Sequence, residues 1–226
     1  PGSISEYKQE AKKQNHPLTF SLSDMTALAS KRFGYSAEDV LKTCQSLYET
    51  HKLTTYPRTD CAYLPESQFA DAPDVLAAVK AVNPALASIV DGADTSIRSR
   101  TWNDKKVSAH HGIIPTMHKG DLNKLNDKER NIYDLVVRAY LAQFYPIHEF
   151  MSTTVAVDVE GETFSAKGKV VTKSGWHDVY LDNSDEDEGD QDDESQSLPK
   201  MGQGDAITCG QAARRRSPRR GLPKVR

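Results

Sequence analysis

The stretch SLSDMTALASKRFGYSAEDVLKTCQSLYETHKL, residues 21–53, predicts two consecutive α-helices around a glycine turn. Ser23 is the expected N-cap of the first helix, and Gly34 lies just past its end. Ser36, followed three residues later by Asp39, resembles a capping box that opens the second helix. Two short helices with a basic end at 31–32 fit a helix-turn-helix, but ordinary helix packing produces the same pattern.

Apolar residues recur at helical spacing in the second helix and in two later segments. In the second helix they predict a buried stripe of Val40, Leu41, Cys44, Leu47 and Tyr48. Residues 65–84 predict a helical region that is interrupted near Pro73 and ended by Asn83-Pro84. Residues 127–144 predict a long helix with a capping box of Asn126 and Glu129.

The period of the apolar residues changes to two from residue 151, which predicts strands. The alternating residues are Val155, Val157 and Val159. Glu160-Gly161-Glu162 predicts a turn, TFSAKGKVV (163–171) the returning strand, and GWHDVY (175–180) the start of another. The first 20 residues are polar and are expected to be extended or frayed. Helices followed by strands predict an α+β fold.

The charges are strongly polarised along the chain although the formal net charge is only −3. DEDEGDQDDE (185–194) predicts a solvated acidic loop, and RRRSPRRGLPKVR (214–226) a basic disordered tail. No apolar run approaches the roughly 20 residues that a membrane span needs, so no membrane partner is expected. Three widely spaced cysteines, Cys44, Cys61 and Cys209, form no zinc or disulfide pattern and fit a reducing compartment.

Residues 52–65, KLTTYPRTDCAYLP, carry a pattern suited to phosphate chemistry. Pro57 favours an extended backbone before it, so Tyr56, Arg58 and Asp60 should point to the same side. A guanidinium offers a planar fork to phosphate oxygens, and a tyrosine can attack phosphorus to form a covalent intermediate. Since a phenol has a pKa of about 10, a cation or a base must help it to react. A buried tyrosine beside a surface ion pair is the alternative.

A second segment, SAHHGIIPT (108–116), follows in the order found in one family. Together with KLTTYPRTDCAYLP, it resembles the two signatures of type IA DNA topoisomerases. SAEDVLKTCQSLYE (36–49) and FSAKGKVVTKSGWHDVY (164–180) also fit, most closely the bacterial topoisomerase III branch. The resemblance covers residues 17–184.

The resemblance implies roles for individual residues. Tyr56 would be the nucleophile that becomes linked to a 5′-phosphate of one DNA strand, and Arg58 would hold the scissile phosphate. His110 would contact the same phosphate region and assist positioning or proton movement. Thr59 and Asp60 complete the motif and orient its turn. The expected DNA-binding residues are Lys52, Thr59, Asp60, Arg98, Arg100, Lys105 and Lys106.

The resemblance also implies an architecture. A mostly helical tyrosine domain, similar to the DNA-binding domain of catabolite activator proteins, would be joined to part of an antiparallel β arch. The expected division is an extended or frayed lead-in over 1–20, the tyrosine domain over 21–146, and the partial β arch over 147–184. The acidic loop would span 185–198, and a residual arch segment with the basic tail 199–226.

A family member would also use a TOPRIM domain that binds Mg²⁺, and this chain is expected to lack it and to hold no metal. The expected partners are that missing domain and single-stranded DNA, and the expected state is a cytoplasmic, nucleoid-associated monomer in a bacterium. Cleavage and religation would need no ATP, and the chain alone would be inactive. The alternatives are a non-catalytic module that binds single-stranded DNA, or a structural fragment that binds partners through its charged segments.

Overall fold

The computed structural model describes residues 2–181, 198–199 and 201–208, and it confirms the α+β class. These residues divide into two compact units. Residues 12–150 and 171–181 form the helical unit; residues 2–11 and 151–170, with the described part of 198–208, form the sheet unit. Most of the predicted acidic loop and all of the basic tail at 214–226 lie outside the described residues.

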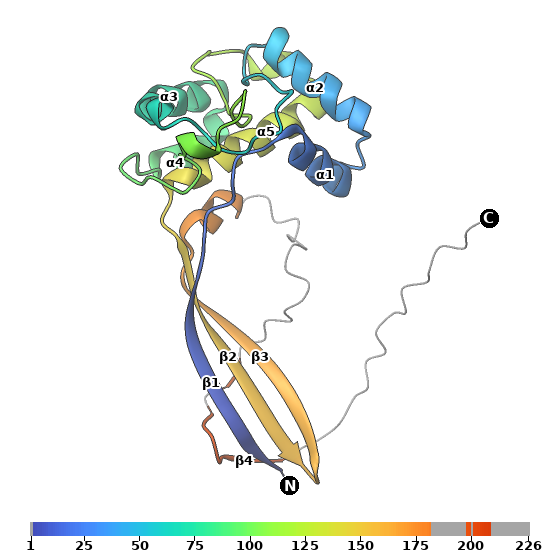
Figure 1. Cartoon of the computed structure of the whole chain (residues 1–226), viewed down its shortest axis with the longest axis vertical. Helices are drawn as coiled ribbons and strands as arrows, with labels where there is room; N and C mark the ends of the chain where they lie inside the picture. The colour runs from blue at the N-terminus through green and yellow to red at the C-terminus, as the bar shows by residue number, and fades with distance from the viewer. Residues whose placement is uncertain (1, 182–197, 200, 209–226) are drawn as a thin grey trace, which may run out of the picture. The chain divides into compact units, whose positions relative to one another are not determined.

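The described strands form one antiparallel sheet in the order β3-β2-β1-β4 (Figure 1). They are β1 (Gly2–Gln14), β2 (His148–Val159), β3 (Glu162–Lys173) and β4 (Ala206–Ile207). The first 20 residues were expected to be extended or frayed, and Gly2–Gln14 is an extended strand held in the sheet. Near its start, the Ile4 amide donates to the Asp205 carbonyl at 3.0 Å.

The turn predicted between β2 and β3 is confirmed. Glu160 and Gly161 both have positive φ, 51° and 88°, which is the geometry of a tight hairpin turn whose twist matches the strands. Val155, one of the alternating valines, is 1% exposed.

The strand predicted for GWHDVY was wrong, because these residues form the 3₁₀ helix η6 (Gly175–Tyr180). Gly175 has φ 58°, a left-handed conformation that ends an extended chain. A Cβ at this position would also overlap the carbonyl oxygen of Pro146, so only glycine fits the bend. The alternation of apolar and polar residues could not reveal this bend at Gly175.

The helical unit contains five α-helices and short 3₁₀ helices among its described residues. The α-helices are α1 (Leu22–Phe33), α2 (Ala37–Glu49), α3 (Ala72–Val82), α4 (Ala87–Asp91) and α5 (Asp127–Leu141). Besides η6, the 3₁₀ helices are η1 (Glu66–Asp71), η2 (Pro84–Leu86), η3 (Asp104–Lys106), η4 (Leu122–Lys124) and η5 (Ala142–Phe144). The interruption predicted near Pro73 is the junction of η1 with α3, whose first turn tolerates a proline that lacks an N–H.

The helix ends follow the predicted capping residues except at the start of α1. Gly34 ends α1 with φ 71°, Ser36 accepts the Asp39 amide at 3.1 Å, and Asn126 with Glu129 forms a full capping box. Ser23 was the wrong N-cap for α1. Ser21 caps it instead by accepting the Asp24 amide at 3.1 Å, the same three-residue spacing as Ser36 and Asp39.

The core of the helical unit surrounds α5, where Ile132, Val136 and Tyr140 are at most 1% exposed. The stripe predicted on α2 is narrower than expected. Its buried members, Val40, Cys44 and Leu47, are spaced by four and three residues, whereas Leu41 is half-buried and Tyr48 is 36% exposed. Those two residues each lie one position, or about 100° of helix rotation, beyond the buried row.

Cys44 and Cys61 are buried and free, and Cys209 lies outside the described residues. Within the described ranges, no helix combines the length and the apolar character needed to cross a bilayer.

Candidate active site and nucleic-acid interface

The two signature segments lie side by side in the helical unit. Thr54 and Pro115 form an antiparallel bridge. Next to it, the Thr55 amide donates to the Ile114 carbonyl at 2.9 Å, and the Ile114 amide donates to the Thr55 hydroxyl at 3.0 Å. Thr54 is buried, as are Ile114 and Pro115, so the pairing is part of the core rather than a surface contact. The chain thereby brings together residues about sixty positions apart.

Side chains after Tyr56 make a second connection to the histidine segment. The buried Thr59 hydroxyl donates to the His110 carbonyl at 3.1 Å, and the Ser108 hydroxyl donates to the Asp60 carboxylate at 3.0 Å. The Gly112 amide donates to the Tyr63 carbonyl at 2.9 Å. These contacts fix where the backbone of His110 lies relative to the tyrosine segment.

Gly112 is required by this close approach. A Cβ on it would overlap the Thr19 hydroxyl and would lie 3.2 Å from the Ala62 backbone. The histidine pair is thus followed by a residue without a side chain for a packing reason.

Tyr56 lies at the surface, in a loop without regular secondary structure, and its side chain contacts two other rings. The residue is 37% exposed. Its ring centroid is 4.7 Å from that of His110 and 5.6 Å from that of Tyr48, which meets it edge-on at 82°. The phenol is therefore accessible to a large ligand, with an imidazole beside it.

Two other tyrosines of the helical unit, Tyr133 and Tyr140, are unsuited to act as nucleophiles. Burial raises the pKa of the Tyr133 phenol, and burial followed by the charge of Asp71 raises the pKa of Tyr140. Both residues are at most 2% exposed, so a DNA backbone could not reach them.

Arg58, two residues after Tyr56, is exposed, and its guanidinium forms no hydrogen bond or ion pair with any described residue. Its planar donor groups are available for a phosphate. Among the described residues, no hydrogen bond or cation–π contact joins Arg58 to either ring of the Tyr56–His110 pair.

The remaining predicted DNA-binding residues lie in different surroundings. The Lys52 Nζ is 5.9 Å from the ring centroid of Tyr48, and the Lys106 Nζ donates to the Tyr63 hydroxyl at 3.2 Å. Lys105 is exposed. Arg98 pairs with Glu66 at 2.6 Å and Arg100 donates to the His16 carbonyl at 3.3 Å, so both contact residues outside the two signature segments.

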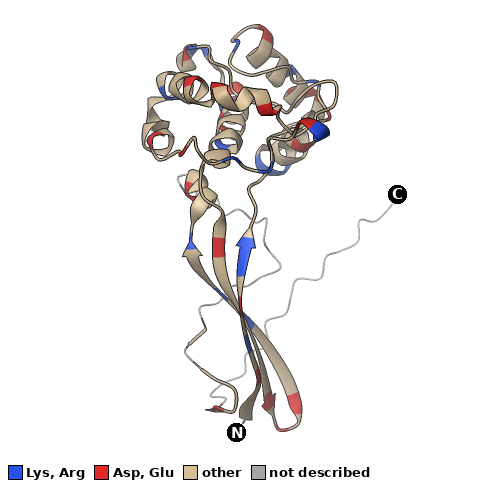
Figure 2. Cartoon of the chain, turned by 60° about the vertical axis from the view of Figure 1, so that its left-hand side comes forward, with Lys and Arg blue, Asp and Glu red and all other residues tan. Residues whose placement is uncertain are grey.

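Acidic and basic side chains are interspersed over the helices, as Figure 2 shows. Lys52, Arg58 and Lys106 are exposed cations in or close to the two signature segments, and their local charge suits a phosphate backbone.

Tyr48 and Ser108 are neighbours of the site that were not predicted from the sequence. Tyr48 was assigned to the buried stripe of α2, and nothing in a single sequence placed it against Tyr56. Ser108 belongs to the second segment, and its role depends on the pairing of that segment with Asp60.

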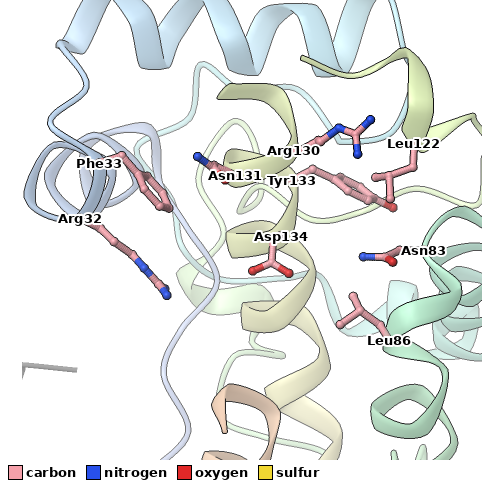
Figure 3. Close-up of a pocket in the computed structure, with 9 residues that line it drawn as sticks. All are labelled: Arg32, Phe33, Asn83, Leu86, Leu122, Arg130, Asn131, Tyr133 and Asp134. Carbon is pink, nitrogen blue, oxygen red and sulfur yellow. The ribbon is translucent and has the colours of Figure 1, made fainter. Parts of the chain in front are cut away.

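A separate cavity of about 360 Å³ lies among α1, η2, η4 and α5 (Figure 3). It is lined by Arg32, Phe33, Asn83, Leu86, Leu122, Arg130, Asn131, Tyr133 and Asp134. Several of its polar groups already have protein partners: the Arg130 Nε donates to the Leu125 carbonyl at 3.0 Å, and the Asn131 amide donates to the Tyr35 hydroxyl at 2.8 Å. None of the predicted site residues lines this cavity.

In residues 2–181, 198–199 and 201–208, no group of three or more His, Cys, Asp or Glu side chains could hold a metal ion.

Comparisons with known proteins identify the family of this chain. A family model described as DNA topoisomerase matches residues 1–218. The chain belongs to the type IA DNA topoisomerase family. Among its curated relatives, the DNA topoisomerase 3 of Vibrio cholerae is 45% identical over 188 residues, covering 83% of this chain and 29% of the relative. That of Bacillus subtilis is 41% identical over 206 residues, covering 90% and 28%.

A solved structure supports the fold alone. The full-length topoisomerase I of Thermotoga maritima is similar with a TM-score of 0.61 at 21% identity, covering 90% of this chain and 32% of that one. The chain thus spans only about three-tenths of the length of the proteins it matches.

Proposed function

We propose that this chain supplies the nucleophile of a type IA topoisomerase reaction, in which one DNA strand is cut and resealed through a covalent link to Tyr56. The observation that supports this most directly is the pairing of residues 53–55 with 114–116. That pairing places an exposed phenol beside the His110 imidazole, 4.7 Å between ring centroids, with the unpaired Arg58 two residues away.

In this mechanism the Tyr56 Oη attacks the scissile phosphorus, and the bond from phosphorus to the 3′ oxygen of the neighbouring nucleotide breaks. The phenol loses its proton, and the departing 3′ oxygen gains one to become a hydroxyl. His110 assists positioning or proton movement, and Arg58 stabilises the charge that develops on the phosphate oxygens. Religation is the reverse attack by the 3′ hydroxyl. Because the tyrosyl phosphate ester conserves the free energy of the broken bond, no ATP is consumed.

The proposal assigns no step to a metal ion on the described residues of this chain. Mg²⁺, a TOPRIM domain that holds it, and single-stranded DNA as substrate belong to the proposed complete enzyme, as does the relaxation or unlinking of DNA. Since the relatives are about three times longer, we propose that the 226-residue chain alone does not relax plasmid DNA.

The direct test uses a complete enzyme in which the matching stretch of this chain replaces its counterpart in the Vibrio cholerae relative, over the 188 residues that align. Tyr56→Phe keeps the ring and removes the nucleophile, so strand cleavage and the covalent protein–DNA adduct should disappear while oligonucleotide binding persists. Continued cleavage by Tyr56→Phe would exclude the assignment. Tyr63→Phe is the matched control, because Tyr63 belongs to the same segment and lies beyond the ring contacts of Tyr56.

A second candidate is a non-catalytic module that binds single-stranded DNA. The exposed rings of Tyr48 and Tyr56 beside Lys52 favour it, because aromatic faces next to a cation suit unpaired bases. In that case Tyr56→Phe would bind normally, Tyr56→Leu would bind weakly, and no covalent adduct would form with either the original chain or the variants.

A further inference from the structure

Tyr48 does not belong to the buried row of α2, so core packing does not account for its position. It lies in the last turn of the helix and is 36% exposed, whereas Val40, Cys44 and Leu47 on the same helix are at most 1% exposed. Its ring instead meets the ring of Tyr56 at a centroid distance of 5.6 Å and an angle of 82°. That edge-to-face geometry is a favoured arrangement for two aromatic rings.

Tyr56 depends on such contacts for its orientation. The residues around it form neither helix nor strand, and the phenol is exposed, so the backbone leaves its ring free to change rotamer. Two rings limit that freedom. His110 is itself on a loop, whereas Tyr48 is carried by a helix whose adjacent row, Val40, Cys44 and Leu47, is buried in the core. Tyr48 therefore connects Tyr56 to a helix that is anchored in the core of the unit.

Lys52 reinforces the same arrangement from the segment between Tyr48 and Tyr56. Its Nζ lies 5.9 Å from the Tyr48 centroid, within reach of a cation–π contact. Its backbone has φ 58°, and its carbonyl accepts the Thr116 hydroxyl at 2.5 Å. This hydrogen bond links the bend after α2 to the second signature segment. It therefore restricts the conformation of the chain between Tyr48 and Tyr56.

We propose that Tyr48 is a positioning residue for the cleavage step. It holds the Tyr56 ring in the orientation from which the phenol oxygen meets the scissile phosphate, without touching DNA itself. This inference rests on the proposed function and extends it to a residue outside both signature segments. A nucleophile must start close to its attack geometry, and small misplacements slow the reaction strongly, so the contact should act on the rate of cleavage rather than on binding.

The size of the effect follows from the contact. An edge-to-face pair contributes enough free energy that its loss should slow cleavage about threefold to tenfold. Tyr48→Leu removes the ring, and Tyr48→Phe keeps it without the hydroxyl. If the ring contact matters, phenylalanine should restore most of the rate that leucine loses.

Tyr35→Leu is the matched control. The Tyr35 ring also has an aromatic neighbour, Phe33 at 5.2 Å, and a lysine, Lys128 at 5.5 Å, but it has no contact with Tyr56. Its loss removes comparable ring contacts at the turn between α1 and α2, together with the hydrogen bond that its hydroxyl accepts from Asn131.

The experiment measures single-turnover cleavage of a labelled single-stranded oligonucleotide by the complete enzyme described above. Tyr48→Leu should cleave about threefold to tenfold more slowly with an unchanged half-saturating concentration, while Tyr48→Phe and Tyr35→Leu stay within about twofold of the original enzyme. An unchanged rate for Tyr48→Leu would overturn the inference. So would equal losses in Tyr48→Leu and Tyr48→Phe, because the ring would then be irrelevant.

A second measurement uses the 226-residue chain without DNA. Tyr48→Leu should shift the ring-proton NMR resonances of Tyr56, and Tyr35→Leu should leave them in place. Unshifted resonances in Tyr48→Leu would refute the contact, whatever the activity of the complete enzyme. Cleavage that persists in Tyr56→Phe refutes the proposed function instead, so the two failures are distinguishable.

Discussion

Thr59→Val tests whether the hydrogen bonds between the two signature segments hold the candidate site together. The Thr59 hydroxyl donates to the His110 carbonyl at 3.1 Å and accepts the Cys61 amide at 3.1 Å, and the residue is only 5% exposed. Valine has nearly the same shape but offers neither a donor nor an acceptor. The substitution therefore removes two hydrogen bonds without opening a cavity.

The two lost bonds differ in their cost. Cys61 is 5% exposed, so no water can replace the acceptor that its N–H loses. This unsatisfied donor should lower the free energy of unfolding by about 1–3 kcal/mol. His110 is exposed, so its carbonyl can turn to solvent, and that loss should be about 1 kcal/mol or less. We expect a total near 2–3 kcal/mol, which corresponds to a fall of about 1 M in the urea midpoint for an ordinary slope.

Urea unfolding of the chain followed by tryptophan fluorescence measures this change, because Trp102 and Trp176, its two tryptophans, both lie in the helical unit. Thr59→Ser retains the hydroxyl and should lose much less. In the complete enzyme Thr59→Val should slow cleavage about tenfold or more, because one of the contacts that hold His110 beside Tyr56 is lost. Equal midpoints for Thr59→Val and the original chain would refute the reasoning, as would equal losses for valine and serine.

The remaining predictions concern packing, capping and pH. Gly112→Ala should destabilise the helical unit by about 2 kcal/mol or more in the same urea assay, since its Cβ would overlap the Thr19 hydroxyl; wild-type stability would contradict this. Ser21→Ala should lower the free energy of unfolding by about 1 kcal/mol and Ser23→Ala by less than about 0.5, and the reverse order would restore Ser23 as the N-cap. Burial favours a raised pKa for the Glu129 carboxyl, but hydrogen bonds from Ser46 and Asn126 and the nearby His51 outweigh it and hold the pKa below its usual value. Its contribution to stability should therefore be complete above the unfolded pKa of about 4.3 and be lost as the pH falls through the folded value. Glu129→Gln should be less stable by about 1–3 kcal/mol at pH 7 and show a flatter acid limb; an unchanged acid limb would contradict the assignment.

Much of the local structure was predictable because its causes lie within a few residues. The left-handed Gly34, the Ser36 cap, the capping box of Asn126 with Glu129 and the turn at Glu160-Gly161 were all indicated by short patterns. The family was also indicated, because two segments with specific residues occurred in the right order. Ser23 was the exception. Both Ser21 and Ser23 precede an apolar periodic run, so the pattern fits either serine as the N-cap. The structure distinguishes them, because the Asp24 amide donates to the Ser21 hydroxyl.

The candidate site depends on side-chain chemistry, which the sequence specifies, and on an arrangement in space, which the tertiary structure specifies. The sequence by itself determined which groups are present, namely the phenol of Tyr56, the guanidinium of Arg58 and the imidazole of His110, because side-chain chemistry is a property of the residue. Their arrangement required the tertiary structure. The ring of His110 lies beside Tyr56 because backbone pairing joins segments about sixty residues apart. Tyr48 meets Tyr56 because the packing of α2 directs the last turn of this helix toward the tyrosine loop. Such contacts depend on the packing of whole elements, and no local preference of the chain encodes them.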